Sequence, residues 1–473
     1  MRVHQQTTKI SLSPLALGMI LAFVVSLPPA LAQNRQASEG AVVLFSPEEA
    51  SAQSQSAPLT LTLQDALQRA QRNDAQFHSA VTDAKLAREN RIQARASLLP
   101  SFNLRSEFLN TQGNGVLPTG RYVTNDGVHV YREWSVFHQD LSPTVLRGTS
   151  YRRAVATEAV ARAKAEIARR GLVVTVTRAY YTLIANQRKY ATAQQALEQA
   201  KNLLIMSQNL ERGGEVAHSD VIKFELQYDA QERTFREAKL AMASARLDLA
   251  VLLFPQFDQN FDVVDDLKLA PTLPSFAQVQ EMAMRENPDL RVAIETARTA
   301  SQDVSIARQA FLPTLALDVN YGIEANSVAL RSRVSADPAA GRLPNLGYFL
   351  TATMTVPVWD WGSTRSKLRQ AELKRQQSKV ELSATQRQLL RNLYAFYQEA
   401  ETAKEELASL RHSAERAAES LRLTTLRYQA GEAAVLEVVD AQNTSTQVRN
   451  AHDDGEVRYS VALADVQTLT ASF

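Results

Sequence analysis

Most of this chain is an internal duplication, and no other feature of the sequence constrains its fold as strongly. Four landmarks recur in the same order. They are Asn73-Asp74 and Asn287-Pro288, Leu98–Phe102 and Phe311–Leu315, Ser142–Gly148 and Val356–Gly362, and Gly214-Glu215 and Gly431-Glu432. The distance along the chain between the members of each pair hardly drifts from the first landmark to the last. We therefore predict two structural repeats, at residues 59–272 and 273–473.

Each repeat shows the same succession of patterns: a helical segment, a pair of strands, a very long helix, a glycine turn and a final helix. The predicted bounds are 62–98, 101–141, 150–211 and 216–253 in the first repeat, and 276–311, 314–358, 363–429 and 433–469 in the second. At 1.5 Å per residue, each long helix would extend about 95 Å. A compact domain does not accommodate such a helix, which favours a coiled coil or a helical tube.

The long helices carry a seam of apolar and small residues in steps of three and four. In the second repeat this seam contains Leu407, Leu410, Ala414, Ala417 and Leu421. The spacing is that of a heptad repeat, and the alanines permit close helix approach. The core stripe of an ordinary helical bundle is the alternative interpretation of the seam alone.

The strand pairs alternate between apolar and polar side chains. In the second pair the apolar residues are Leu315, Leu317, Val319, Tyr321 and Ile323, and Tyr348, Leu350, Ala352, Met354, Val356 and Val358. Each run has about ten residues, which is the length that a tilted barrel strand needs to cross a bilayer. The first pair shows a weaker alternation, with the apolar residues Phe102, Leu104 and Phe108 in one strand and Val128, Val130, Trp134 and Val136 in the other. Four strands cannot enclose a barrel, so a membrane barrel would need several copies of the chain. The alternative is two amphipathic hairpins packed on helices.

The first residues have the pattern of a secretory signal. Arg2 and Lys9 precede the apolar run Leu15–Leu27, and Ala30-Leu31-Ala32 offers a cleavage site. We predict a signal peptide at 1–32 and, because 33–58 is rich in Ser, Gln and Ala without periodicity, a flexible extension there. No later apolar stretch is long enough for a helix that spans a bilayer, so strands would have to make any membrane crossing.

Composition and motifs argue against several classes of protein. Lys and Arg total 52 and Asp and Glu total 50, so no basic excess points to nucleic acid. The chain has no cysteine, which excludes disulfides, thiol catalysis and a lipidated cysteine. The seven histidines are dispersed, and we find no metal-binding, phosphate-binding or hydrolase motif. We therefore expect no enzyme activity, no metal and no cofactor.

With these features the chain resembles the TolC-type outer-membrane efflux protein (outer membrane factor) family over nearly all of 59–473. The duplication and the Leu-Pro step into the first strand of each repeat carry the resemblance, together with Val356–Gly362, Tyr428–Glu432 and Val438–Gln442. The resemblance implies a mixed α and β membrane protein in the outer membrane. Three copies with four strands each would share a twelve-stranded transmembrane β-barrel, continued by a long α-helical barrel in the periplasm.

The same resemblance implies a function. The homotrimer would be the exit duct of a tripartite efflux or secretion system. It would passively conduct substrates from an inner-membrane pump and a periplasmic membrane-fusion adaptor to the exterior. The competing hypothesis is a soluble periplasmic coiled-coil adaptor or scaffold protein, which has no need to expose the long alternating strands.

The glycine turns mark the predicted entrance of the tunnel. Gly213, Gly214 and Gly431 would form hairpin turns at the periplasmic tip, since glycine accepts positive φ at a helix end. Just beyond the second turn, Glu437 and Asp440 are spaced i, i+3 on one helical face. A solvated helix face is the ordinary explanation for such a pair.

The resemblance gives these positions further roles. It assigns the family's acidic constriction ring to Glu437 and Asp440, and it matches Asp220 and Tyr428 to residues whose contacts hold the entrance shut. Ala433 departs from the pattern, because some family members place an arginine there. This departure weakens the case for a tight closing salt bridge.

Overall fold

The structure is a computed structural model that describes residues 59–110, 129–256, 260–267, 273–325, 328–331 and 344–470. All of them belong to one unit, Pro58–Phe473. The predicted signal peptide at 1–32 and the predicted extension at 33–58 lie outside the described residues.

Within this unit the predicted order of elements occurs twice. The first set is β1 (Leu59–Leu61), α2 (Leu63–Asn73), α3 (Ala75–Ala96), β2 (Ser101–Asn110), β3 (His129–Asp140), α4 (Pro143–Leu146), α5 (Thr149–Arg212) and α6 (His218–Leu253). After β4 (Phe261–Val263), the second set is α7 (Phe276–Glu286), α8 (Pro288–Gln309), β5 (Thr314–Ala325), β6 (Leu346–Thr355), α9 (Ser363–Gln429) and α10 (Val435–Thr470). The exact boundary between the repeats, after residue 272, stays a prediction.

The predicted helical segments 62–98 and 276–311 are each divided into two helices. The carboxylate of Asp74 accepts a hydrogen bond from the Phe77 backbone N–H at 2.6 Å, and the Asn287 side chain accepts one from Leu290 N–H at 2.9 Å. Each residue caps the second helix and has an extended backbone, which interrupts the first helix. Each segment was predicted as one helix, although Pro288 occupies a position in α8 that favours a helix start.

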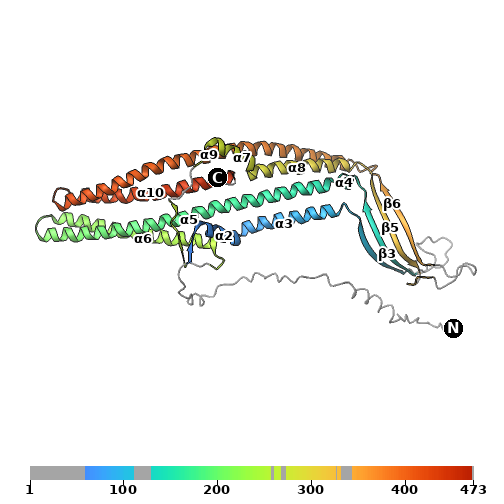
Figure 1. Cartoon of the computed structure of the whole chain (residues 1–473), viewed down its shortest axis with the longest axis horizontal. Helices are drawn as coiled ribbons and strands as arrows, with labels where there is room; N and C mark the ends of the chain where they lie inside the picture. Colours follow the sequence, from blue (N-terminus) through green and yellow to red (C-terminus); the bar gives the residue numbers. More distant parts are fainter. Residues whose placement is uncertain are drawn as a thin grey trace, which may run out of the picture. The chain divides into compact units, whose positions relative to one another are not determined.

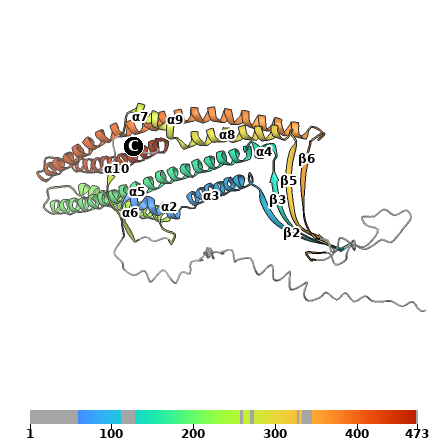
Figure 2. The same ribbon diagram turned by 45° about the vertical axis from the view of Figure 1, so that its right-hand side comes forward.

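The long helices agree with their predicted bounds. α5 has 64 residues and α9 has 67, and each begins after a glycine in the left-handed region, Gly148 or Gly362. α5 packs against α6, and α9 against α10, while α8 and α10 lie between α5 and α9. The four long strands lie at one end of these helices, and the α5–α6 and α9–α10 turns lie at the other (Figures 1 and 2).

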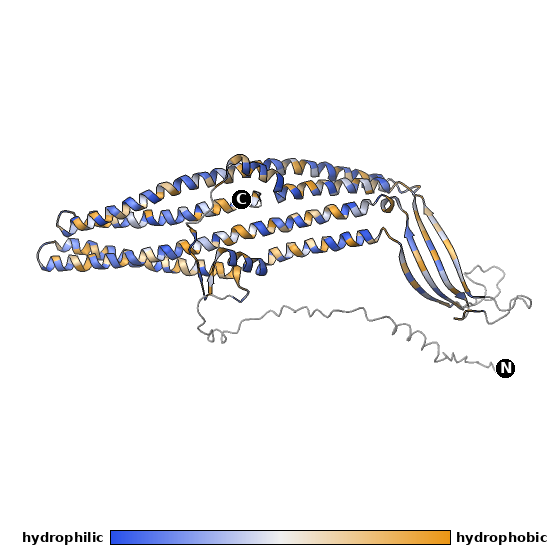
Figure 3. Ribbon diagram, in the orientation of Figure 1, coloured by the Kyte–Doolittle hydropathy of each residue, from blue (hydrophilic) through white to orange (hydrophobic). Residues whose placement is uncertain are grey.

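The strands form one antiparallel sheet in the order β2-β3-β5-β6. Its register places Phe102, Phe137, Val319 and Leu350 in one row across all four strands. The adjacent row, on the opposite face, contains Asn103, Val136, Asn320 and Phe349. The predicted apolar residues of β2, β5 and β6 share one face, whereas Val130, Trp134 and Val136 of β3 lie on the opposite face, so the prediction for this strand was wrong. The hydropathy colouring in Figure 3 shows apolar and polar residues alternating along the strands. β2 and β6 are the edges of the sheet.

The last strand differs from its prediction, 348–358. β6 starts earlier, at Leu346, and ends at Thr355. Pro357 accounts for the earlier end, because proline has no N–H to donate to a strand ladder.

The largest buried cluster lies midway along the helices, where β1 and β4 pair in parallel against α5. Tyr180 is fully buried there, and its single hydroxyl proton lies between two acceptors, the carbonyls of Val264 at 2.7 Å and Leu61 at 3.1 Å. These bonds fix the small sheet to the long helix. In the described part of the chain, no helix combines the length and the apolar character needed to cross a membrane.

Candidate functional site

The two glycine turns share one hydrogen-bond pattern. Gly214 and Gly431 have φ values of 77° and 75°, in the left-handed region that favours glycine. After Gly214, the N–H of Glu215 donates to Leu210 O at 2.9 Å; after Gly431, the N–H of Glu432 donates to Arg427 O at 2.8 Å. Both are Schellman-type helix ends. Gly213 has an ordinary φ of −77°, so the backbone does not require glycine there.

A small apolar core lies beside these turns. Its buried members are Leu203, Phe224, Tyr428, Val435 and Val438. The ring of Tyr428, on α9, meets the ring of Phe224, on α6, edge to face, with their centroids 5.7 Å apart. The two helical hairpins of one chain, α5–α6 and α9–α10, therefore touch through an aromatic pair. Edge-to-face packing of such a pair contributes about 0.5–1.5 kcal/mol beyond the burial of its surface.

The two predicted closure residues lie near each other without a hydrogen bond between them. Burial, and secondarily the negative charge of Asp220, raise the pKa of Tyr428. The Asp220 carboxylate instead accepts a hydrogen bond from Lys223 Nζ at 2.9 Å. The buried Tyr428 hydroxyl has no hydrogen-bond partner among the described residues. The ring of Tyr428, rather than its hydroxyl, thus makes the contact between the hairpins.

Glu437 and Asp440 are both exposed at the start of α10, whereas Val435 and Val438 on the same turns are buried. The Glu437 carboxylate accepts from the Ala434 N–H at 3.2 Å and pairs with Arg427 Nη1 at 3.4 Å. Within the described residues, no ion pair involves Asp440. The predicted acidic face exists, and an arginine on the preceding helix partly neutralises it.

Sequence reasoning missed Arg427. Because position 433 is alanine, the turn was expected to lack an arginine. Arg427, in the last turn of α9, supplies one. A second guanidinium bond from Arg427 to Glu432 O, at 3.2 Å, holds the side chain across the turn. A basic residue in the last helical turn, opposite an acidic residue in the next first turn, was the available signal.

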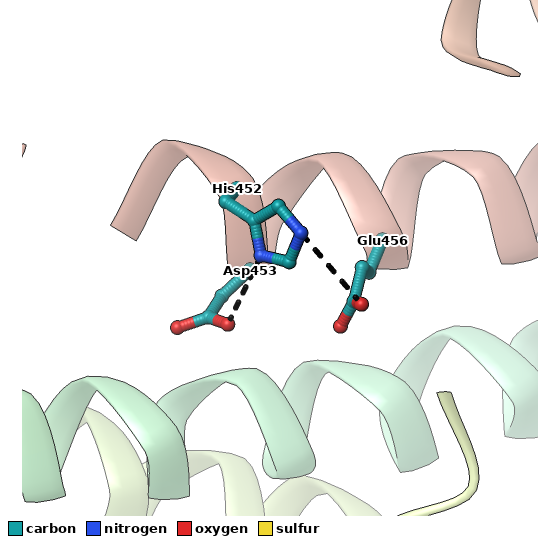
Figure 4. A group of neighbouring side chains, drawn as sticks. All are labelled: His452, Asp453 and Glu456. Carbon is teal, nitrogen blue, oxygen red and sulfur yellow. Dashed lines mark ion pairs between the residues drawn. The ribbon is translucent and has the colours of Figure 1, made fainter. Parts of the chain in front are cut away.

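A polar cluster midway along the helices was also missed. His452, Asp453 and Glu456 lie on α10, and their potential ligand atoms fall within 4.8 Å of one another (Figure 4). His452 lies 3.8 Å from Asp453 Oδ1 and 3.9 Å from Glu456 Oε1, through different ring nitrogens. This triad is the one group of side chains, among the described residues, that has the composition of a metal site.

Arg188 of α5 occupies this cluster. Its guanidinium donates to Glu456, to Asp453 at 3.4 Å and to Asp265 at 2.5 Å. A fixed positive charge in this position opposes the binding of a divalent cation, so we interpret the cluster as a clamp that joins α5, α10 and the segment after β4. Burial raises the pKa of Asp453.

A family model described as "Outer membrane efflux protein" matches residues 279–472. The chain is 26% identical, over 66% of its length, to the outer membrane protein OprJ of Pseudomonas aeruginosa, and the match spans 63% of that protein. It is 24% identical to the outer membrane protein TolC of Vibrio cholerae, over 79% of this chain and 82% of the relative. Both relatives are outer membrane proteins by name.

Solved structures share the fold. The outer membrane protein VceC of Vibrio cholerae superposes with a TM-score of 0.73 at 17% identity, covering 87% of this chain and 96% of VceC. The CmeC outer membrane channel of Campylobacter jejuni gives 0.70 at 17% identity, covering 86% of this chain and 85% of CmeC. The chain thus has the fold of these proteins, in which long helices continue from antiparallel strands.

Proposed function

Because the chain belongs to the outer membrane efflux protein family, we propose that it forms the outer-membrane channel of a tripartite efflux system. In this proposal, three copies assemble around a common axis, and substrates pass from an inner-membrane pump and a periplasmic adaptor to the exterior. The channel conducts passively and catalyses no reaction.

The two-faced sheet with two open edges carries this proposal. One face presents rows of apolar residues, such as Phe102, Phe137, Val319 and Leu350. Many of these side chains are exposed, which suits a lipid environment better than water. The edge strands β2 and β6 each offer an unsatisfied row of backbone groups, which the next copy would pair. Three copies of the four-stranded sheet give twelve strands, enough to enclose a lumen.

The opposite face of the sheet supports the same orientation. It carries His138 in a contact of 2.7 Å with Asp318, and Arg132 in ion pairs with Glu107 at 3.0 Å and Glu324 at 2.9 Å. Charged groups of this kind belong on the water-filled side of a barrel wall. The soluble adaptor hypothesis gives no reason for a sheet with one lipid-like face and one charged face.

In this arrangement the paired turns form the periplasmic entrance. Three-fold symmetry would repeat Glu437 and Asp440 as two stacked acidic rings, which concentrate cations and exclude anions. The packing of Tyr428 on Phe224, with Asp220 beside it, would hold each chain's two hairpins together in the closed entrance.

Three measurements test the proposal. After a carbonate wash, the protein should remain with the outer membrane, and light scattering in mild detergent should give a trimer. The purified protein should then conduct ions in planar bilayers. Release by the wash together with absence of conductance would favour the adaptor hypothesis. A monodisperse monomer that conducts would contradict the trimer alone.

The biological role needs a separate test. Deletion of the gene should raise sensitivity to toxic compounds, and a plasmid copy should restore resistance. A version with the sheet residues Val319→Arg and Leu350→Arg, both on the apolar face, serves as the matched negative control. Full complementation by this control would argue against a role for the sheet in the membrane.

A further inference from the structure

Two tryptophans are almost fully exposed where the last strand returns to a long helix. Trp359 and Trp361 follow β6 and precede α9, and their exposed fractions are 75% and 89%. Their rings pack edge to face with centroids 5.5 Å apart, and Val358 beside them is also exposed. Such an exposed aromatic cluster marks an interaction site more often than an isolated apolar residue does.

The backbone at Trp361 is strained. Its φ of 55° is the one positive φ at a non-glycine residue in the described part of the chain, and Gly362 follows with φ 84°. For a bulky side chain this conformation costs about 1–2 kcal/mol. Asp360 holds the loop in place, because its carboxylate accepts hydrogen bonds from the N–H groups of Gly362 at 3.0 Å and Thr364 at 2.7 Å.

The first repeat makes the same connection without this strain. The residues there that are equivalent to Trp359, Trp361 and Gly362 are Val145, Arg147 and Gly148. They follow or belong to the short helix α4, and Gly148 alone takes a positive φ. Joining a strand to a long helix therefore does not require a left-handed tryptophan. The strain at Trp361 is thus particular to the second repeat among these two connections.

The chemistry of indole indicates the partner. An indole ring has a large apolar body and one N–H donor, and it is enriched at the bilayer–water interface for this reason. The rings adjoin the end of β6, whose Leu350 and Met354 lie on the exposed apolar face of the sheet. The third tryptophan, Trp134, lies on the opposite face and is buried against Phe349.

We propose that Trp359 and Trp361 form an aromatic anchor that lies in the phospholipid headgroup region of the periplasmic leaflet. The proposal rests on the proposed function, since it requires the sheet to lie in the membrane. A neighbouring copy of the chain is a less suitable partner. The connection in the first repeat shows what neighbouring helices do at this position. There α5 and α8 lie against α4, yet Arg147, the equivalent of Trp361, stays exposed. A neighbouring copy that lay against the second connection in the same way would therefore leave Trp361 exposed too.

Fluorescence quenching by brominated phospholipids tests this anchor, because the chain has only three tryptophans. In Trp134→Phe/Trp359→Phe, Trp361 is the sole emitter; in Trp359→Phe/Trp361→Phe, the sole emitter is Trp134. Both are reconstituted in phosphatidylcholine vesicles with bromines placed near the headgroups or near the chain ends. We expect headgroup-proximal bromines to quench Trp361 about twofold more than Trp134, and chain-end bromines to quench Trp361 less.

Two further variants keep the test decisive. Trp361→Phe alone retains the Trp134–Phe349 packing, and it should lose only the part of the headgroup-bromine quenching that Trp361 contributes, because Trp359 remains. Leu350→Trp, made in a chain without the three native tryptophans, places an emitter on the apolar face and should be quenched by deep bromines.

One outcome is that bromines near the chain ends quench the Leu350→Trp chain while Trp361 behaves like Trp134. The proposed anchor is then wrong, whereas the placement of the sheet in the membrane is supported. Protection of Trp361 from both bromolipid and aqueous acrylamide would assign it to a contact between copies instead. If no emitter on the apolar face is quenched, the proposed membrane function fails first.

Discussion

The two hairpins at the turn end have the same backbone and opposite chemistry. Both turns use the same hydrogen bonds, and the equivalent residues Val221 and Val438 are both buried beyond them. One position earlier, Asp220 corresponds to Glu437. Two positions after the valines, however, Lys223 in the first hairpin corresponds to Asp440 in the second. The first hairpin therefore pairs its carboxylate with a lysine at 2.9 Å, whereas the second presents two carboxylates.

This difference shows which part of a duplicated fold is free to change. The buried valines and left-handed glycines are needed by either hairpin, because they set the packing and the turn. The exposed positions between them carry charge and are independent of the fold. In a trimer, the acidic face would recur three times around the entrance, from the second repeat alone.

The aromatic contact between the helical hairpins likewise occurs once and has no counterpart in the other repeat. Of the changes considered, its removal should have the largest effect on stability. Phe224 corresponds to Ala441, and Tyr428 corresponds to Glu211, so each chain makes this contact once. Phe224→Ala should destabilise the tip by about 3–5 kcal/mol, since Phe224 is fully buried. Hydrogen exchange in 203–224 and 428–438 should rise, and single-channel conductance should increase.

Two controls refine this prediction. Glu211→Ala removes an exposed contact of 2.7 Å with His218 and should change tip exchange little. Tyr428→Phe should leave the entrance closed, because the hydroxyl that it removes is buried without a partner among the described residues. An open, highly conducting Tyr428→Phe channel would show that the hydroxyl, and not the ring, closes the entrance.

The strands offer a second comparison between the repeats. Val319 corresponds to Ser106 of the first repeat, and both lie on the apolar face. Ser106, however, donates a hydrogen bond to Glu133 on the neighbouring strand. Val319→Arg should lower assembly stability by about 2–4 kcal/mol if it lies near the bilayer centre. Ser106→Arg should cost less, because Glu133 can pair with the new charge. Heat-resistant trimer on gels measures both, and equal losses would remove the difference between the repeats.

The elements that follow a period were predictable from the sequence. The heptad seam indicated the long helices α5 and α9. The alternation at 314–323 indicated which residues of that strand share a face of the sheet. Breaks and pairings were not predictable in this way. Asp74 ends α2 and caps α3 within what was predicted as one helical segment. Arg188 meets Glu456, which lies far along the sequence in the other repeat, a pairing that only the fold creates.

Glu437 and Asp440 are exposed on α10, and their role as an acidic ring stays a prediction; the arginine beside Glu437 was not predicted. The family resemblance directed attention to position 433, whereas the arginine that pairs with Glu437 lies at 427, on the other side of the turn. Which exposed side chains meet across a tight turn depends on the angle of the two helices. Val435, Val438 and Tyr428 pack together in the core beside this turn.

Exchanging the charges of the two hairpins should change ion selectivity without changing stability much. Asp440→Lys replaces a negative by a positive charge, which raises the net charge by two per chain, and Lys223→Asp lowers it by two at the corresponding position. In planar bilayers, cation preference and block by trivalent cations should weaken in the first variant and strengthen in the second. If both leave selectivity unchanged, the hairpin ends do not line the conducting path, even if the channel proposal stands.

The smallest expected effect concerns Arg427, and it distinguishes a free acidic face from a neutralised one. Arg427 and Glu437 are both about half exposed, so their ion pair at 3.4 Å contributes only about 0–1 kcal/mol to stability. Arg427→Gln should therefore assemble normally. It removes one positive charge per chain from beside Glu437, so trivalent cations should block at lower concentration and high salt should reduce the difference from the native channel.

Arg212→Gln is the matched control, because Arg212 ends the equivalent helix of the first repeat and hydrogen-bonds Asn209 at 2.8 Å instead of a carboxylate. Stronger block in both variants would indicate a general loss of positive charge at the tip. Stronger block in Arg427→Gln alone would place the sensitive carboxylate at Glu437, and an unchanged block in both would move the cation site away from the second hairpin.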